Sequence, residues 1–117
     1  MFDEPVSGDP CDYVIKRPPS STRHEYIEQR SGCRVIEVKN DSGCIIDNEH
    51  SLETDSSVIE KWRIKQGDPL SATIQTNWFQ IIRRENWLIS TRSKLTVKCN
   101  IHSFFITASI IAFENDK

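Results

Sequence analysis

This sequence has little alanine and leucine, no excess of charge of one sign and no long apolar run. Alanine and leucine are scarce, whereas isoleucine, serine, threonine and asparagine are common, and this balance favours strands over helices. The formal net charge of −2 implies no bulk attraction to nucleic acid or to an anionic membrane. No apolar run approaches the roughly 20 residues of a membrane-spanning helix, and the opening Met-Phe-Asp-Glu-Pro does not resemble a secretory signal. We therefore expect a soluble, cytoplasmic protein without a nucleic-acid or membrane partner.

Sequence signatures of catalysis are also missing. The cysteines (Cys11, Cys33, Cys44 and Cys99) are widely spaced and form no Cys-x-x-Cys pair, so we interpret them as free thiols of a reducing compartment, some of them buried as small hydrophobes. There is no Gly-x-Ser-x-Gly nucleophile elbow, and the chain is too short to add the parallel sheet that would hold one. We predict that the chain is not an enzyme and has no catalytic residue, no cofactor and no metal site.

Residues 87–99 carry the clearest pattern in the chain. One set of alternating positions is mainly apolar: Trp87, Ile89, Thr91, Ser93, Leu95, Val97 and Cys99. The other set carries three cations: Arg92, Lys94 and Lys98. Successive side chains of an extended chain point to opposite faces, so this period of two predicts a long, half-buried strand.

The runs on either side of this strand have a similar character. Residues 70–84 and 103–113 are rich in β-branched and aromatic side chains, and short polar breaks separate them from residues 87–99. Three such runs predict an antiparallel meander. Because residues 103–113 carry apolar side chains on both faces, we expect them to form a central or doubly covered strand.

The first half of the chain predicts shorter strands. We expect an irregular arm over residues 1–12 and a single β domain over residues 13–117. Strands are predicted at residues 13–15, 24–30, 33–39, 44–46 and 58–65. Residues 24–30 and 33–39 should form a hairpin, residues 40–43 (Asn-Asp-Ser-Gly) a turn, and residues 47–57 a loop. The predicted fold is all-β: an antiparallel twisted sheet, sandwich or partly open barrel of about seven or eight strands, with little or no helix.

A series of short segments resembles the C-terminal region of CocE/NonD-type hydrolases, which belong with the X-prolyl dipeptidyl-peptidases and cocaine esterases. The segments are residues 17–23 (Arg-Pro-Pro-Ser-Ser-Thr-Arg), 35–43 (Val-Ile-Glu-Val-Lys-Asn-Asp-Ser-Gly), 67–72 (Gly-Asp-Pro-Leu-Ser-Ala), 86–87 (Asn-Trp), 99–100 (Cys-Asn), 104–108 (Phe-Phe-Ile-Thr-Ala) and 112–115 (Ala-Phe-Glu-Asn). The order of these segments carries the resemblance, which covers most of the chain.

This resemblance implies a non-catalytic accessory or assembly domain, or a stand-alone remnant of one. In the full-length relatives an α/β-hydrolase domain carries a Ser-Asp-His triad, and a jelly-roll domain follows it. The relatives continue into one further strand beyond the position of Asn115, so we expect an unpaired sheet edge here. The partner at that edge would be a second copy, giving a homo-oligomer, or the catalytic domain or chain of a hydrolase.

The three tryptophans, Trp62, Trp78 and Trp87, are the candidate ligand-binding residues. They could line the pocket of a small-molecule-binding β-barrel, which is the alternative function that we consider. Large aromatic side chains on alternating strands also occur as ordinary core residues, and the sequence does not distinguish these two roles.

Other polar sets allow a chemical interpretation and a plainer one. Cys99 and His102 could form a nucleophile–base pair, or a strand-end thiol beside an exposed histidine. The other histidines (His24 and His50) are expected to be solvated loop or edge residues, and the serine clusters at residues 20–22 and 56–57 are expected to lie in loops. The acidic loop residues are Asp47, Glu49, Glu53 and Asp55, and their spacing does not match a calcium-binding loop. The clustered cations, which are Arg83, Arg84, Arg92, Lys94 and Lys98, could bind single-stranded nucleic acid or simply keep a strand soluble.

Overall fold

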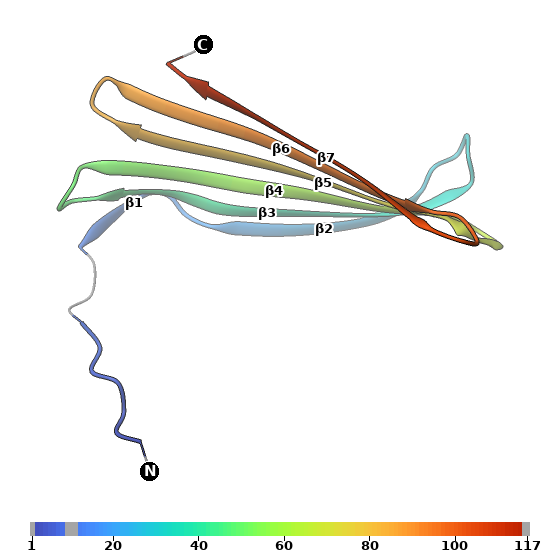
Figure 1. The fold of residues 1–117 in the computed structure, drawn as a ribbon, viewed down its shortest axis with the longest axis horizontal. Helices are drawn as coiled ribbons and strands as arrows, with labels where there is room; N and C mark the ends of the chain where they lie inside the picture. Colours follow the sequence, from blue (N-terminus) through green and yellow to red (C-terminus); the bar gives the residue numbers. More distant parts are fainter. Residues whose placement is uncertain (1, 9–11, 116–117) are drawn as a thin grey trace.

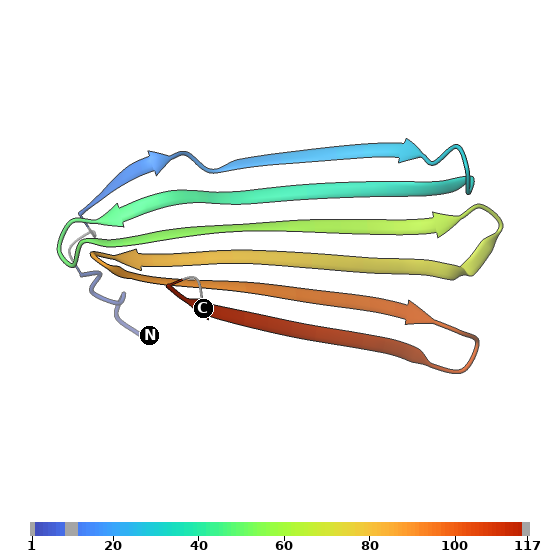
Figure 2. The ribbon, with the colours of Figure 1, turned by 90° about the horizontal axis from the view of Figure 1, so that it is seen from above.

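The structure is a computed structural model that describes residues 2–8 and 12–115, and its described part is one open antiparallel sheet (Figures 1 and 2). The strands are β1 (Tyr13–Arg17), β2 (Ser20–Ile27), β3 (Cys33–Asp47), β4 (Leu52–Lys65), β5 (Asp68–Arg84), β6 (Trp87–Cys99) and β7 (Phe104–Glu114). Their order in the sheet is β1-β3-β4-β5-β6-β7. The predicted all-β class with about seven strands is confirmed, and its form is a twisted single sheet.

Strands β1 and β2 share one side of the sheet. Both pair with β3, one after the other along its length, and Figure 2 shows them together as one margin with β7 as the other. The proline pair at residues 18–19 separates them, since proline cannot donate a ladder hydrogen bond. The predicted hairpin of the first half is confirmed by the pairing of β2 with β3, and the predicted meander by the pairings β5–β6 and β6–β7.

A β-bulge stands where a turn was predicted. Residues 40–43 lie inside β3, and the register with β4 shifts between Asp41 and Gly43. The Asp41 carboxylate accepts a hydrogen bond of 2.8 Å from the Gly43 N–H, and Gly43 has a φ of 80°. The turn prediction was wrong because residues that favour turns also favour β-bulges. In a bulge one strand contains an extra residue, and a glycine with positive φ often stands beside it.

Three further sequence predictions were wrong. The predicted loop over residues 47–57 is a turn over residues 48–51, and β4 begins at Leu52, because its polar residues pair with β3 on one side and, from Glu53, with β5 on the other. The serine cluster at residues 20–22, which was also expected in a loop, begins β2. The predicted central strand, β7, is the edge of the sheet, and ten of its eleven residues are exposed. A strand with apolar side chains on both faces is stabilised when both faces are buried. Its sequence does not show whether the same chain or a partner buries them.

The sheet leaves an unusually large surface in contact with solvent. Among the described residues, the buried hydrophobic side chains are Val35, Cys44 and Val58, all on β3 and β4. The accessible surface is 9650 Å², whereas a compact monomer of 13.5 kDa exposes about 6,500 Å². The radius of gyration is 19.5 Å, against about 13 Å for a compact domain of this length. The described residues therefore form a single layer of sheet, whereas a sheet is normally covered by a second layer.

The described part of the chain contains no helix that is long and apolar enough to cross a membrane.

Candidate functional site

The three tryptophans lie on one face of the sheet. Directly paired residues of an antiparallel ladder share a face, and the face alternates with each step along a strand. Trp62 pairs with Ile74, four residues from Trp78 on β5, and Trp87 pairs with Arg84, six residues from Trp78. These even separations place all three side chains on the same side, which we call the tryptophan face.

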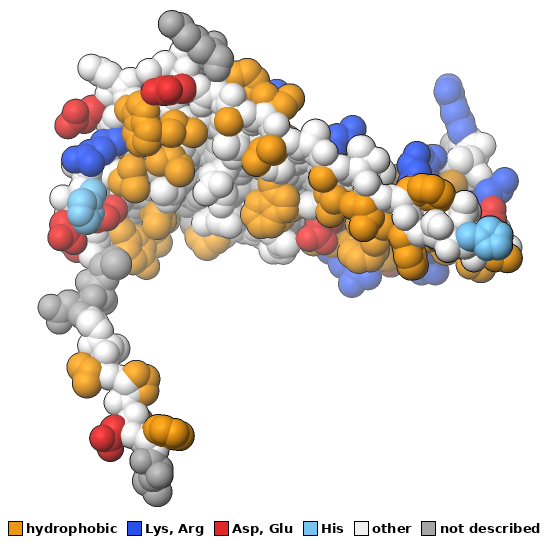
Figure 3. All heavy atoms as spheres, in the orientation of Figure 1, with side chains coloured by type: hydrophobic (Ala, Val, Ile, Leu, Met, Phe, Trp, Pro, Cys, Tyr) orange, Lys and Arg blue, Asp and Glu red, His pale blue; other side chains and the backbone are white. Residues whose placement is uncertain are grey.

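Most of the large apolar side chains of the central strands share this face. From the register, the tryptophan face includes Ile36, Val38, Val58, Ile64, Ile74, Ile82, Ile89, Leu95, Val97, Phe104, Ile106 and Ile110. Trp62, Trp78 and Trp87 remain 44%, 49% and 43% exposed. Figure 3 shows hydrophobic side chains at the surface along the length of the sheet. The amphipathic pattern has thus sorted apolar groups to one side, although the described residues place nothing over them.

The tryptophans do not converge on one pocket. Trp78 lines a shallow hollow of about 290 Å³ with Leu95, Ala108 and Ile110. Trp62 lines a separate hollow of about 310 Å³, on β3 and β4. Trp87 lines neither, and its Nε1 donates a hydrogen bond of 3.1 Å to Glu114. The arrangement is therefore an extended apolar surface with hollows.

Sequence reasoning missed the largest hollow on the tryptophan face. It has a volume of about 810 Å³ and lies where the end of β2 meets the β4–β5 turn, with Ile27, Arg34 and Ile64 among its lining residues. The guanidinium of Arg34 pairs with Glu25 in this hollow. Its walls come from segments that are far apart in the sequence, so no local pattern could have revealed it. The one available signal was the apolar residue Ile27 at the end of a charged strand.

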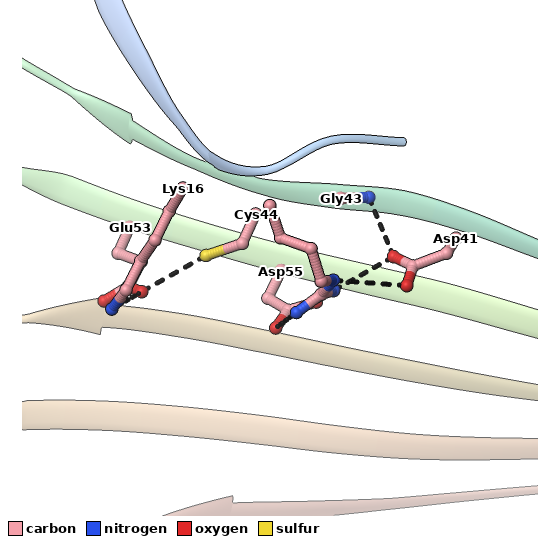
Figure 4. A network of polar contacts seen from close by, with 7 residues as sticks. Lys16, Asp41, Gly43, Cys44, Glu53 and Asp55 are labelled. Carbon is pink, nitrogen blue, oxygen red and sulfur yellow. Dashed lines mark hydrogen bonds and ion pairs between the residues drawn. The ribbon is translucent and has the colours of Figure 1, made fainter. Parts of the chain in front are cut away.

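The opposite face carries an ion-pair network that joins β1 to β3 and β4 (Figure 4). Arg17 donates hydrogen bonds to Asp41 (2.9 and 3.2 Å) and to Asp55 (2.5 and 3.0 Å). The Arg17 hydrogen bond, followed by that of the Gly43 N–H, lowers the pKa of Asp41. Hydrogen bonds to the carboxylates of Asp55 and Asp41 raise the pKa of Arg17 above its ordinary value. Because Asp41 forms the bulge, this network secures β1 to the irregular point of β3.

A second polar group lies beside the first on the same face. Lys16 pairs with Glu53 at 2.9 Å, Arg83 approaches the same carboxylate at 3.3 Å, and the Cys44 thiol contacts it at 3.2 Å. These contacts, led by the Lys16 hydrogen bond, lower the pKa of Glu53 to about 2. Burial, and then the contact with Glu53, raise the pKa of the Cys44 thiol. A raised pKa favours the protonated thiol, which is the form of a buried structural cysteine.

Four of the five clustered cations lie on one face of the sheet. The register places Arg83, Arg92, Lys94 and Lys98 on the face opposite the tryptophans and Arg84 on the tryptophan face. Arg83 is also paired with Glu53. The structure adds two cations that the sequence reasoning did not group with them: Lys61 and Arg63 line a groove with Lys94 and Lys98, and Arg63 pairs with Glu28 there.

The Cys99 thiol and His102 have separate hydrogen-bond partners in the described structure. The Cys99 thiol contacts the carbonyl of Leu70 at 3.8 Å, whereas the backbone N–H of His102 donates to the Asn100 side chain. His24 lies on β2 and His50 in the β3–β4 turn, so the histidines do not meet. Cys33, Cys44 and Cys99 are free thiols. Cys11, also interpreted as a free thiol, and part of the predicted arm at residues 1–12 lie outside the described residues.

The acidic residues 47–55 separate into two groups. Asp47, Glu49 and His50 offer ligand atoms within 4.8 Å of one another in the exposed β3–β4 turn. Asp47 and His50 pair at 2.9 Å, which lowers the pKa of Asp47 and raises that of His50. Glu53 and Asp55 instead belong to the ion-pair network described above.

Comparison with known proteins adds no relative: no protein-family model, no curated protein and no solved structure matches this chain. The resemblance to the CocE/NonD-type hydrolases accordingly stays a prediction.

Proposed function

We propose that this chain is a non-catalytic assembly module whose tryptophan face is buried against another layer of protein. The observation that carries the proposal is the position of Trp62, Trp78 and Trp87 on one face, each more than two-fifths exposed. A tryptophan side chain offers about 150–250 Å² of surface, so each of them leaves on the order of 100 Å² uncovered. Extended apolar faces on soluble domains mark protein interaction sites.

The surface area supports this function quantitatively. The chain exposes about 3,000 Å² more than a compact protein of its mass would. Obligate interfaces bury about 2,000–5,000 Å² in total, half of it on each partner. The excess is therefore large enough to form one side of such an interface. Burial of apolar area at about 25 cal/mol per Å² would provide the driving force.

The chemistry of the opposite face fits the same function. Some of its charged side chains are paired in the Arg17 and Glu53 networks. Arg92, Lys94 and Lys98 lie on the same face. Charged side chains of this kind favour contact with water. The resemblance to hydrolases makes the catalytic domain of such an enzyme one candidate for the covering layer, and that enzyme would supply any ester or amide hydrolysis.

Replacement of two tryptophans of the tryptophan face tests this function. In the full chain, the double variant Trp62→Thr, Trp78→Thr keeps β-favouring side chains but removes much of the exposed apolar surface. We expect it to reduce self-association in light scattering, and binding of the dye anilinonaphthalene sulfonate, several-fold. The matched control is Phe79→Thr, next to Trp78 on the opposite face, where the residue is 39% exposed. A chain that is monomeric and binds no dye before any substitution would contradict the proposed function.

The hollow beside Trp78 favours a second candidate function, the binding of an apolar small molecule. Its walls are mainly apolar, from Trp78, Leu95, Ala108 and Ile110. A ligand seated there would shift the emission of Trp78, and Trp78→Phe would remove that shift while Trp87→Phe would leave it unchanged. Titration with a series of apolar probes that produces no saturable shift would contradict this candidate.

A further inference from the structure

The outward backbone of β7 can be assigned residue by residue. Asn100 N–H donates to the Ser103 carbonyl at one end of the β6–β7 ladder, and Asn115 N–H donates to the Leu88 carbonyl at the other. Hydrogen-bonded pairs alternate along an antiparallel ladder. The odd-numbered residues of β7 therefore bind β6, while the even-numbered residues direct their N–H and C=O groups away from the sheet. In the described part of the chain, no strand accepts these outward groups.

The two margins of the sheet differ in how they resist a new strand. The β1–β2 margin carries the proline pair at residues 18–19 and the charged sequence Arg23-His24-Glu25. Prolines and charges are the usual protection of edge strands against pairing. Strand β7 has no proline, and its single charged residue is Glu114 at the very end. Ile106 is 67% exposed, Ile110 71% and Phe104 78%, so the apolar side chains of this margin are also open.

We propose that β7 pairs antiparallel with β7 of a second copy of this chain, with Ser109 of each copy opposite Ser109 of the other. This alignment pairs the whole strand with itself. On the tryptophan face Ile106 would meet Ala112 and Ala108 would meet Ile110, so each isoleucine faces an alanine, and Phe104 would meet Glu114. On the opposite face Phe105 would meet Phe113, an aromatic cross-strand pair of the kind that stabilises sheets.

The alignment also satisfies the backbone. Its directly hydrogen-bonded pairs would join even-numbered residues, Ala108 with Ile110 and Ile106 with Ala112, which are the residues whose polar groups point outward. A shift of two residues toward the carboxyl end would set Ile110 against Ile110 and Ile106 against Glu114, and would leave the start of each strand unpaired. The two-fold axis would stand perpendicular to the sheet, so both tryptophan faces would lie on one side.

This inference goes beyond the proposed covering of the tryptophan face, because it concerns the margin of β7 and neither face of the sheet. The first experiment is cysteine cross-linking of the full chain under mild oxidation. Ser109→Cys would place two thiols in a directly opposed pair, about 4.5–5.5 Å apart between Cα atoms, which a disulfide can span. We expect a shift from a band of 13.5 kDa to one of twice that mass.

Thr107→Cys is the matched control, on the same strand and the same face. In the proposed dimer the two copies of residue 107 are offset by four positions, or about 13 Å, which is beyond the reach of a disulfide. The unsubstituted chain gives the background from its own cysteines. Equal cross-linking by Ser109→Cys and Thr107→Cys, or a monomeric mass at every concentration, would overturn the inference.

A charge exchange gives an independent measurement. Within one chain, Ser109 pairs with Lys94. The glutamate of Ser109→Glu would therefore attract Lys94 in the monomer and repel its own copy across the proposed two-fold axis. We expect the dimer dissociation constant of Ser109→Glu to rise about tenfold or more. An equimolar mixture of Ser109→Glu and Ser109→Lys should restore association in light scattering. Association that survives Ser109→Glu but is lost in the double tryptophan variant would overturn the β7 pairing and support the tryptophan face as the contact.

Discussion

Gly43 in β3 lies against the backbone of residues 17–19, where the chain passes from β1 to β2. It has a φ of 80°, and a Cβ at this position would lie 2.4 Å from the carbonyl oxygen of Arg17 and 3.0 Å from Pro18 and Pro19 backbone atoms. A side chain here would therefore have to displace the main chain where β1 leaves the sheet. The other glycines of positive φ in the described turns, Gly32 and Gly67, have open space around them.

We expect Gly43→Ala to destabilise the fold by more than the backbone conformation alone would cost. A residue other than glycine in the left-handed region costs about 1–3 kcal/mol, and the contact with Arg17 adds to this. Gly67→Ala is the control. Gly67 has a φ of 77° and nothing lies within 4 Å of an added Cβ, so this variant shows the loss of stability from backbone conformation alone. Urea unfolding of both variants measures the difference, and equal losses of stability would show that the close approach to Arg17 is unimportant.

Glu53 should make the protein sensitive to acid. Its pKa is lowered to about 2 from an ordinary value of 4.5. A depressed carboxyl pKa contributes stability that is present above about pH 4.5 and is lost as the pH falls toward about 2. We expect Glu53→Gln to flatten the dependence of the urea midpoint on pH within this window.

The control for this acid dependence is Glu60→Gln, on the same strand but on the tryptophan face. Glu60 makes none of the ion pairs found among the described residues, so we expect Glu53→Gln to change the slope more than Glu60→Gln does. If Glu53→Gln and the unsubstituted chain have the same slope, the Lys16 and Cys44 contacts do not hold the carboxylate in its charged form.

At the scale of the strand, the bulge in β3 decides which side chains face which way. One extra residue between Asp41 and Gly43 places Cys44 and Asp41 on the same face, although they are an odd number of positions apart. If Ser42 took a regular, paired position in the ladder, every side chain from Gly43 to Asp47 would change face. The burial of Cys44, which is 4% exposed, therefore requires Ser42 to stay unpaired.

Deletion of Ser42 should remove the bulge and leave Cys44 on its buried face, because Gly43 and Cys44 would keep Ser56 and Asp55 as partners in a regular ladder. We expect the number of thiols that react with a disulfide reagent under native conditions to stay unchanged. The control is insertion of one glycine after Glu49, in the exposed β3–β4 turn, where added length is tolerated. A Ser42 deletion that exposes a new reactive thiol would show that residues 43–47 have changed face.

At the scale of the whole molecule, one sheet layer with a very small buried core should depend on association. Only Val35, Cys44 and Val58 are buried hydrophobic residues among those described. If cover comes from a second copy, as the β7 pairing or a contact of tryptophan faces would supply, the folded state is coupled to protein concentration.

We expect the thermal midpoint of the chain to rise by several degrees over a hundredfold increase in concentration. A hundredfold change in the concentration of a bound partner corresponds to about 2.7 kcal/mol, which is several degrees for a domain of this size. Scanning calorimetry over this range measures the shift, with Ser109→Glu and the double tryptophan variant as comparisons. A midpoint independent of concentration would show that the single chain is stable without self-association.

The sequence by itself determined the all-β class, the meander from β5 to β7 and the hairpin of β2 with β3. It did so because alternation of apolar and polar side chains is a local property of an extended chain. The alternation in β6 also placed Trp87 opposite its cations before any neighbour was known. The sorting of Trp62 and Trp78 to the same face required the register, which local pattern does not contain.

Only the tertiary structure decided the rest. It placed β7 at the margin, since the position of a strand in a sheet depends on which other strands pair with it. It converted residues 40–43 from an expected turn into a bulge, because β4 offers a partner on both sides of that point. It also brought Arg17 to Asp41 and Asp55, residues that are 24 and 38 positions away along the chain. Pairings of this kind are long-range, and their geometry is set by the whole ladder of backbone hydrogen bonds.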